Sequence, residues 1–207
     1  GFPDLARMME RKTHLDSAAM ALMVVLCAAW GLQQVAIKVA NAGISPVWQA
    51  SLRSIGAALL VWAWAAGKGI RLFERDGTLG PGLLSAALFA GIVAAFAESL
   101  GLPTKSQLLG DGMLLLAAVL WAATTLVIKG SVLAKVSPAK TLFYQLAGSA
   151  LVLPFVSLAL GEPGVIALTP LVLASLAYQT VLVAFASYLA WFWLVKTYPA
   201  GRLAAFS

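Results

Sequence analysis

One pattern of nine residues occurs twice in this chain, and this internal repeat constrains the fold more than any other feature. Segment 30–38 reads WGLQQVAIK and segment 121–129 reads WAATTLVIK, so both follow Trp-x-x-polar-polar-x-x-Ile-Lys. The copies are 91 residues apart (121 − 30). Each is followed by a short link, a Ser-Pro pair and a second apolar run. The chain therefore contains two copies of one structural unit.

Composition and charge-free stretches place both units in a membrane. Mean hydropathy is +0.92 and only 11% of residues are charged, far outside the range of soluble proteins. The stretches 17–37, 77–97, 141–161 and 163–195 carry no charge, and each has the roughly 20 residues that cross a hydrocarbon core. The apolar runs are continuous rather than alternating, which favours helices. We therefore expect an all-α polytopic membrane protein, and internal repeats in such a protein favour a transporter.

The boundaries of the predicted spans are well marked. We expect spans at 17–40, 46–66, 112–130, 139–160 and 169–195, with a shorter apolar stretch at 82–97. Three spans open with a hydroxyl residue and a proline, namely Ser45-Pro46, Ser137-Pro138 and Thr169-Pro170. We expect each hydroxyl to cap the first helical turn, with proline at N1 where its missing N–H costs nothing.

The distribution of lysine and arginine predicts how the spans cross the membrane. Basic residues gather before residue 17, at 67–80, at 129–140 and after residue 195, whereas 41–45 and 161–168 have none. The positive-inside rule therefore places the N-terminus and the basic loops in the cytoplasm. The first span of the first copy then enters the membrane from the inside, and the first span of the second copy enters it from the outside. Repeats inverted in this way let one fold expose a central site to each side in turn.

The chain is expected to have four parts. Residues 1–16 form a polar basic leader, 17–97 the first repeat, 98–111 an outer loop and 112–207 the second repeat. The leader is interpreted either as a short helix on the inner membrane surface or as a remnant of an added sequence. The first repeat looks incomplete near Gly91-Ile92, because 82–97 is short beside its counterpart 169–195. The second repeat looks truncated at Ser207.

Several of these motifs together resemble a known family. Trp-x6-Ile-Lys, a short link, Ser-Pro-x6-Arg and a glycine three residues later resemble the EamA-type branch of the drug/metabolite transporter superfamily, and especially the YddG-type bacterial amino-acid exporters. The resemblance covers nearly the whole chain from Ala18 onward. It implies ten helices in two inverted repeats around a central cavity, of which about six are visible in this sequence.

The resemblance also implies a function. It implies a bacterial inner-membrane permease that exports small metabolites, most of all neutral and aromatic amino acids, by alternating access. Two alternatives remain open at this point. One is a carrier of drugs or other metabolites, such as nucleosides or sugar-like solutes, and the other is a membrane scaffold or receptor that moves no solute.

Polar side chains interrupt the apolar runs of both copies along one helix face. In the first copy these residues are Trp30, Gln33, Gln34 and Lys38, and in the second they are Trp121, Thr124 and Thr125. Amides facing lipid are costly, so the stripe is expected to face protein or a water-filled path. It is either the wall of a cavity that binds a small polar solute or a set of hydrogen bonds between helices. Lys38 is also explained by a side chain that reaches the membrane interface.

Arg53 is the most informative single residue. It lies about 10 Å along its helix from Pro46, in a span without an acid, which costs several kcal/mol unless the guanidinium is paired. Its partner is a substrate carboxylate, a set of backbone carbonyls or the solvent at the interface. Gln145 is its neutral counterpart in the second copy. The other candidate cavity residues are Tyr144, Tyr178, Gln179, Ser187 and Trp191. The amphipathic rings of the last span suit amino-acid side chains, and Trp191 is alternatively part of an aromatic belt at the inner end of the span.

Motifs for other chemistries are missing from the sequence. The only histidine is His14 and the only cysteine is Cys27, and there is no His-Glu-x-x-His, Gly-x-Ser-x-Gly or phosphate-binding loop. We therefore expect no enzyme, no cofactor and no metal site. The expected partners are a small-molecule substrate, with amino acids first, and the lipid bilayer, but no nucleic acid. The chain is expected to act as a monomer.

Overall fold

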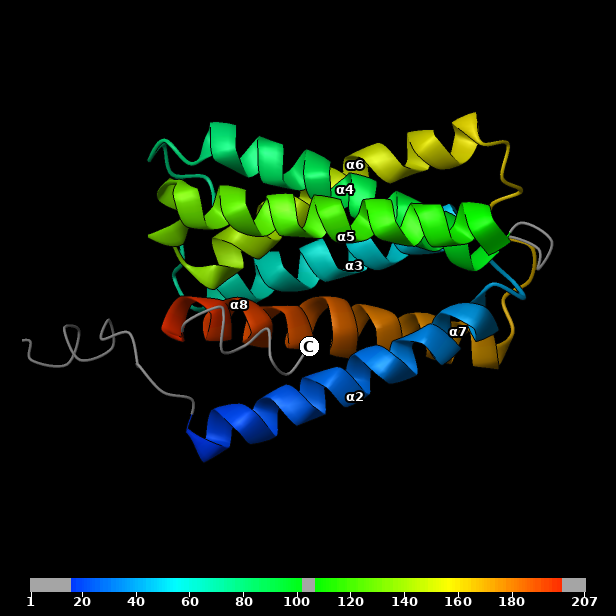
Figure 1. Ribbon diagram of the computed structural model, residues 1–207, viewed down its shortest axis with the longest axis horizontal. Coiled ribbons are helices and arrows are strands. Elements are labelled where there is room, and N and C mark those ends of the chain that lie inside the picture. The colour runs from blue at the N-terminus through cyan, green and yellow to red at the C-terminus, as the bar shows by residue number, and fades with distance from the viewer. Residues whose placement is uncertain (1–15, 102–106, 199–207) are drawn as a thin grey trace, which may run out of the picture.

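The computed structural model describes residues 16–101 and 107–198, and in these ranges the chain is all-α (Figure 1). The predicted leader lies outside the described residues, apart from Asp16. Six long helical rods are described. They are α2 (Ser17–Ala40), α3 (Pro46–Gly67), α4 (Leu79–Gly101), α5 (Gln107–Gly130), α6 (Pro138–Ala159) and a last rod made of α7 (Pro170–Ala177), η3 (Tyr178–Ser187) and α8 (Tyr188–Thr197). A short 3-10 turn, η2 (Val132–Ala134), precedes α6.

Five of these helices are long and apolar enough to cross a membrane. They are Ser17–Ala40, Pro46–Gly67, Gly112–Gly130, Pro138–Ala159 and Pro170–Val195. This confirms the prediction of a multi-pass membrane protein. The apolar part of α4, Leu79–Ala95, is shorter, as the sequence suggested. The helices α4 and α5 extend into 98–111, so the connection between them is shorter than expected, because helix formation does not stop where the apolar run stops.

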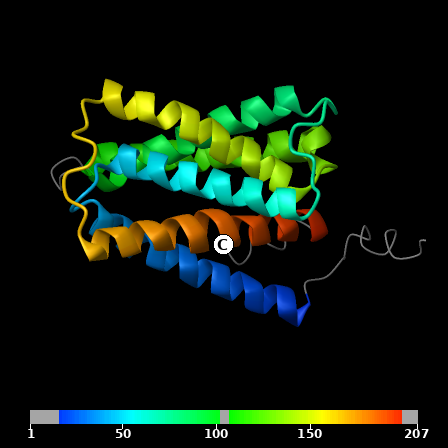
Figure 2. The same cartoon turned by 180° about the vertical axis from the view of Figure 1, so that it is seen from behind.

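The helices form two layers. Helices α3, α4, α5 and α6 pack together, with α3 and α6 side by side in both views (Figures 1 and 2). Helix α2 packs against the last rod, and this rod contacts α3 and α6. The residue distribution is that of a protein in lipid: Leu151 and Phe155 are more than 70% exposed on the outside, whereas Arg53 and Gln145 are buried.

The helix caps agree with the sequence pattern at two positions and differ at a third. Ser137 Oγ accepts a hydrogen bond from the backbone N–H of Lys140 at 3.2 Å, and Thr169 Oγ1 accepts one from Val172 at 3.3 Å. Ser45 occupies the N-cap position of α3, but its side chain makes no cap bond. The prediction for this hydroxyl is wrong because a carboxylate from a distant loop takes its place.

That carboxylate belongs to Glu162, in the loop between α6 and α7. It accepts hydrogen bonds from the backbone N–H groups of Val47 (2.9 Å) and Trp48 (3.0 Å), and the Ser45 hydroxyl donates to it at 3.2 Å. A carboxylate at the positive end of a helix is more stabilising than a neutral hydroxyl. The same two loops also pair through their backbones, since Gly43 O accepts from Ile166 N at 2.8 Å.

The last rod contains ten residues of π-helix in its middle, η3 (Tyr178–Ser187). A π segment shifts the face that its side chains present and is common at functional sites. This segment packs against α3, where Thr180 meets Gly56 so closely that a side chain at Gly56 would approach its methyl group to 2.7 Å. Glycine at 56 therefore allows the π segment to lie against α3.

Gly148 allows a second close helix contact. A Cβ atom at this position in α6 would lie 2.5 Å from the Cβ atom of Ala86 in α4. Small residues let membrane helices approach closely, and the resulting dispersion contacts stabilise the bundle.

We predict that Gly148→Ala destabilises the folded protein by about 1–3 kcal/mol, because α4 and α6 must move apart. Gly31→Ala is the matched control, since nothing lies within 4 Å of a Cβ atom there. Thermal unfolding in detergent measures both, and equal melting temperatures for the two variants would contradict the packing described here.

Candidate functional site

A cavity of about 260 Å³ lies where α2, α5 and α8 meet. Its lining residues are Trp30, Gln33, Trp121, Tyr188 and Trp191. Four of these five were predicted as cavity residues from the sequence, and they come from three helices far apart along the chain. The fold therefore brings the aromatic ends of both repeated motifs to one place.

The aromatic rings of this cavity are held in defined orientations. Trp30 Nε1 donates a hydrogen bond to Ser187 Oγ at 2.9 Å, and the Ser187 hydroxyl donates to Val183 O at 2.6 Å. Trp30 and Trp191 meet edge to face, with ring centroids 5.6 Å apart and an interplanar angle of 76°. This arrangement is favourable for aromatic pairs. The predicted site residue Ser187 thus orients a lining ring and is not itself one of the lining residues.

A second, smaller cavity of about 20 Å³ shares Trp121 and Trp191 with the first. Thr124, Thr125 and Gln145 line it as well. The hydroxyls of both threonines donate to carbonyls of their own helix, Thr124 to Leu120 O at 2.8 Å and Thr125 to Trp121 O at 3.0 Å. The threonines therefore lie at the cavity without bonding to another helix.

Two buried amides have no hydrogen-bond partner among the described residues. Gln145 is 1% exposed and Gln179 is 0% exposed, and neither the nitrogen nor the oxygen of either side chain is paired. Leaving a buried amide unpaired costs roughly 1–3 kcal/mol. Thr141 and Ser149, each four residues from Gln145 on the same face of α6, also have unpaired buried hydroxyls. Of these residues on one face of α6, Gln145 is the one that lines the smaller cavity.

Arg53 lies on the facing helix α3 and is also buried, at 6% exposure. It lines a void of about 10 Å³ together with Gln49 and Gln179. The part of the chain that the structure describes provides neither an ion pair nor a hydrogen bond to its guanidinium, and Tyr188 lies within electrostatic range of it. Its burial argues against the interpretation in which the side chain reaches the interface.

The remaining predicted residues lie outside the cavity lining. Lys38 is exposed, as expected for a side chain at the membrane interface, and Gln34 is half-buried. The Tyr178 hydroxyl donates to Ala29 O at 2.9 Å and joins the last rod to α2. The Tyr144 hydroxyl pairs with Thr78 at 3.1 Å, at one end of α6.

Tyr188, Thr141 and Ser149 were not among the candidate residues. The spacing of Thr141 and Ser149 around Gln145 was a usable signal, because polar residues at i, i+4 and i+8 share one helix face. Tyr188 lies three residues before Trp191 and therefore on the same side of α8. This spacing was therefore a usable signal for Tyr188 as well.

Comparison with known protein families gives a match to the second half of the chain. Residues 108–207 match the family model described as the EamA-like transporter family. No curated protein and no solved structure matches the chain. The matched segment contains Trp121, Gln145, Tyr188 and Trp191, and the match does not extend to amino-acid exporters in particular.

The match and the structure agree on the class of protein. Members of this family are transporters and not enzymes, which confirms the expectation of a non-enzymatic chain. The five candidate spans provide the multi-pass architecture that such a protein needs. Residues 108–207 are therefore similar to the EamA-like transporter family of the drug/metabolite transporter superfamily, in agreement with a multi-pass membrane transporter.

Proposed function

We propose that the protein is a bacterial inner-membrane permease that exports small zwitterionic metabolites, neutral and aromatic amino acids first. The observation that carries this proposal is the composition of the 260 Å³ cavity. Three indole rings and one phenol surround the amide of Gln33, and none of the described lining residues is charged. Such a lining suits an uncharged side chain, with one amide to fix its orientation.

Arg53 supports a zwitterionic substrate. A guanidinium presents a fork of donors that matches a carboxylate, and every amino acid carries one. The unpaired oxygens of Gln145 and Gln179 accept hydrogen bonds from an ammonium group, and their nitrogens donate to a carboxylate. Binding a zwitterion would therefore offset the cost of three buried, unpartnered polar side chains.

Helices α3 and α6 support alternating access between two inverted repeats. Both have 22 residues and start at a proline after a serine, at an offset of 92 residues (138 − 46). They run antiparallel, because Glu162 after α6 meets the start of α3. Arg53 and Gln145 occupy equivalent positions in these two helices. Repeats related in this way provide two similar states that open to opposite sides of the membrane.

The first prediction concerns Gln33, the only amide that lines the larger cavity. We expect Gln33→Leu to lower amino-acid counterflow in proteoliposomes by about 10-fold, because a hydrogen bond worth about 1–1.5 kcal/mol is lost at nearly constant volume. Gln34→Leu is the matched comparison, and we expect a smaller effect because Gln34 lines neither cavity.

The counterflow assay also distinguishes the alternatives. Vesicles are preloaded with unlabelled alanine, methionine, phenylalanine or a nucleoside. Exchange of the nucleoside alone would favour another metabolite carrier of the superfamily. Full exchange by Gln33→Leu at equal folded yield would contradict the assigned role of the cavity, and no exchange of any solute would favour a scaffold.

The second prediction concerns Arg53 and the substrate carboxylate. We expect phenylalaninamide, which lacks the carboxylate, to compete with phenylalanine at least about 10-fold less well in the unaltered protein, because charge-assisted hydrogen bonds contribute about 1.5–3 kcal/mol. Arg53→Gln should weaken the binding of phenylalanine and leave the binding of phenylalaninamide nearly unchanged. If Arg53→Gln weakens both ligands equally, the guanidinium does not bind the carboxylate.

A further inference from the structure

The loops that follow α3 and α6 each bind the start of the other helix. After α6, Glu162 caps the first turn of α3 through the backbone N–H groups of Val47 and Trp48. After α3, the loop 68–78 carries Glu74 and Asp76 to the first turn of α6. The two contacts lie at opposite ends of the antiparallel helix pair (Figure 1). We call them the Glu162 contact and the Asp76 contact.

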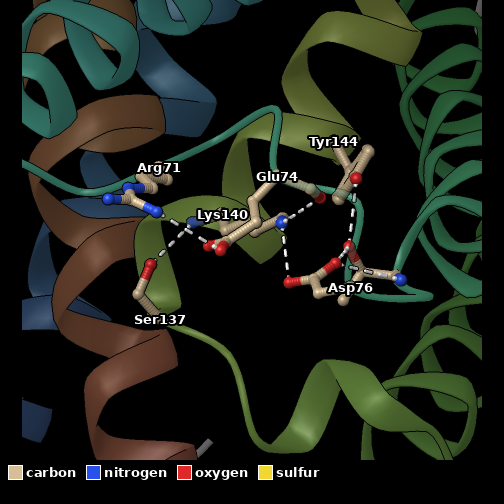
Figure 3. A network of polar contacts seen from close by, with 7 residues as sticks. Arg71, Glu74, Asp76, Ser137, Lys140 and Tyr144 are labelled. Carbon is tan, nitrogen blue, oxygen red and sulfur yellow. Dashed lines mark hydrogen bonds and ion pairs between the residues drawn. The ribbon is translucent and has the colours of Figure 1, made fainter.

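The Asp76 contact is built around one buried cation (Figure 3). Lys140, in the first turn of α6, is 3% exposed. Its Nζ atom lies 2.8 Å from Asp76 Oδ2 and donates to Glu74 O at 3.2 Å. A lysine at the positive end of a helix is unfavourable by itself, so the carboxylate compensates for both the lysine and the helix dipole.

Thr78 and Tyr144 hold the carboxylate in place. The Thr78 hydroxyl donates to Asp76 Oδ1 and lies 3.1 Å from the Tyr144 hydroxyl of α6. The hydrogen bonds from Lys140 and Thr78 lower the pKa of Asp76 to about 2. Because this pKa is lowered in the folded state, the stabilisation is present above the ordinary pKa of an aspartate and is lost only as the pH falls towards about 2. The contact is therefore intact at neutral pH.

The neighbouring ion pair between Arg71 and Glu74 is exposed to solvent, unlike Lys140. Arg71 and Glu74 lie 3.5 Å apart, but their side chains are 79% and 52% exposed. Exposed ion pairs of this kind contribute little to the stability of the folded protein. Glu74 binds Lys140 through its backbone carbonyl alone, so its carboxylate is not part of the Asp76 contact.

We propose that these two contacts are the alternating latches of the transport cycle, so that the Asp76–Lys140 pair closes the cytoplasmic end and Glu162 closes the opposite end. The inference rests on the proposed function and on the orientation predicted from the basic residues. A cycle of alternating access needs at least one contact at each end that can break while the other holds. Here each contact joins the two helices that carry Arg53 and Gln145, and both are made by loop residues that can separate without unfolding a helix.

The proposal predicts opposite effects for the two acids. The substitution Gln33→Cys places a cysteine in the cavity, and Cys27→Ser removes the native thiol. A membrane-impermeant thiol reagent is then added to one side of sealed vesicles of known orientation. Asp76→Asn is expected to raise the labelling rate from the cytoplasmic side about 3-fold and to lower it from the other side. Glu162→Gln is expected to do the reverse, with a smaller change because the backbone pairing of Gly43 with Ile166 remains.

Two further variants separate a latch from a general effect on folding. Glu74→Gln is the matched control and should leave both rates unchanged. The charge exchange Asp76→Lys with Lys140→Asp should restore the original rates, since it keeps the pair and places an acid at the start of α6. If Asp76→Asn yields no folded protein, Thr78→Val, which removes only a supporting hydrogen bond, is expected to shift the rates in the same direction as Asp76→Asn.

Labelling rates that change in the same direction for Asp76→Asn and Glu162→Gln, or do not change, would overturn the proposal. So would failure of the charge exchange to restore them. Labelling needs no substrate, so the outcome does not depend on the amino-acid assignment. Opposite shifts in a protein that exchanges none of the tested amino acids would support the latches and refute only the proposed substrate.

Discussion

Helices α3 and α6 pack side by side and antiparallel, and the other helices of the bundle are arranged around this contact. Helix α4 packs on α6, the last rod packs on both helices, and α2 lies against that rod. Small residues make these approaches possible, as Gly148 does for α4 and Gly56 does for the π segment. Because the neighbouring helices cover them, Arg53 of α3 and Gln145 of α6 are both buried away from lipid.

The polar interior has a cost that packing alone does not explain. Arg53 is a buried cation, and Gln145 and Gln179 are buried amides without partners among the residues that the structure describes. In a bundle selected only for stability, apolar residues of similar volume would be more favourable. The proposed transport function gives a reason to retain them, because a polar substrate would need hydrogen-bonding groups in the middle of the membrane. In this proposal the aromatic cavity, which Trp121 and Trp191 line, would provide the apolar part of the site.

Much of the fold could be predicted because it depends on local patterns. The spans follow from charge-free runs, and their starts follow from Ser-Pro and Thr-Pro pairs. The positions of Trp30, Gln33 and Trp121 at one cavity follow from helical spacing in two repeated motifs. The family match over residues 108–207 agrees with the resemblance seen in the second copy of the motifs.

The features that could not be predicted depend on contacts between distant segments. Glu162 caps α3 from 115 residues away, and no local pattern indicates that it replaces Ser45. The Asp76 contact depends on where the loop after α3 meets α6. The hydroxyl of Tyr144 takes part in this contact through Thr78, and not in the cavity. The π segment has no signature in an apolar run, so the register between α7 and α8 could not be derived.

The central claim is that the aromatic cavity holds the transported solute, and tryptophan fluorescence tests it most directly. Three of the seven tryptophans line this cavity. Titration of the purified protein with methionine should give a saturable change in emission, and replacing Trp30, Trp121 and Trp191 with phenylalanine should abolish it. A saturable change that survives this triple replacement, or no change in a protein that exchanges methionine across vesicles, would contradict the account.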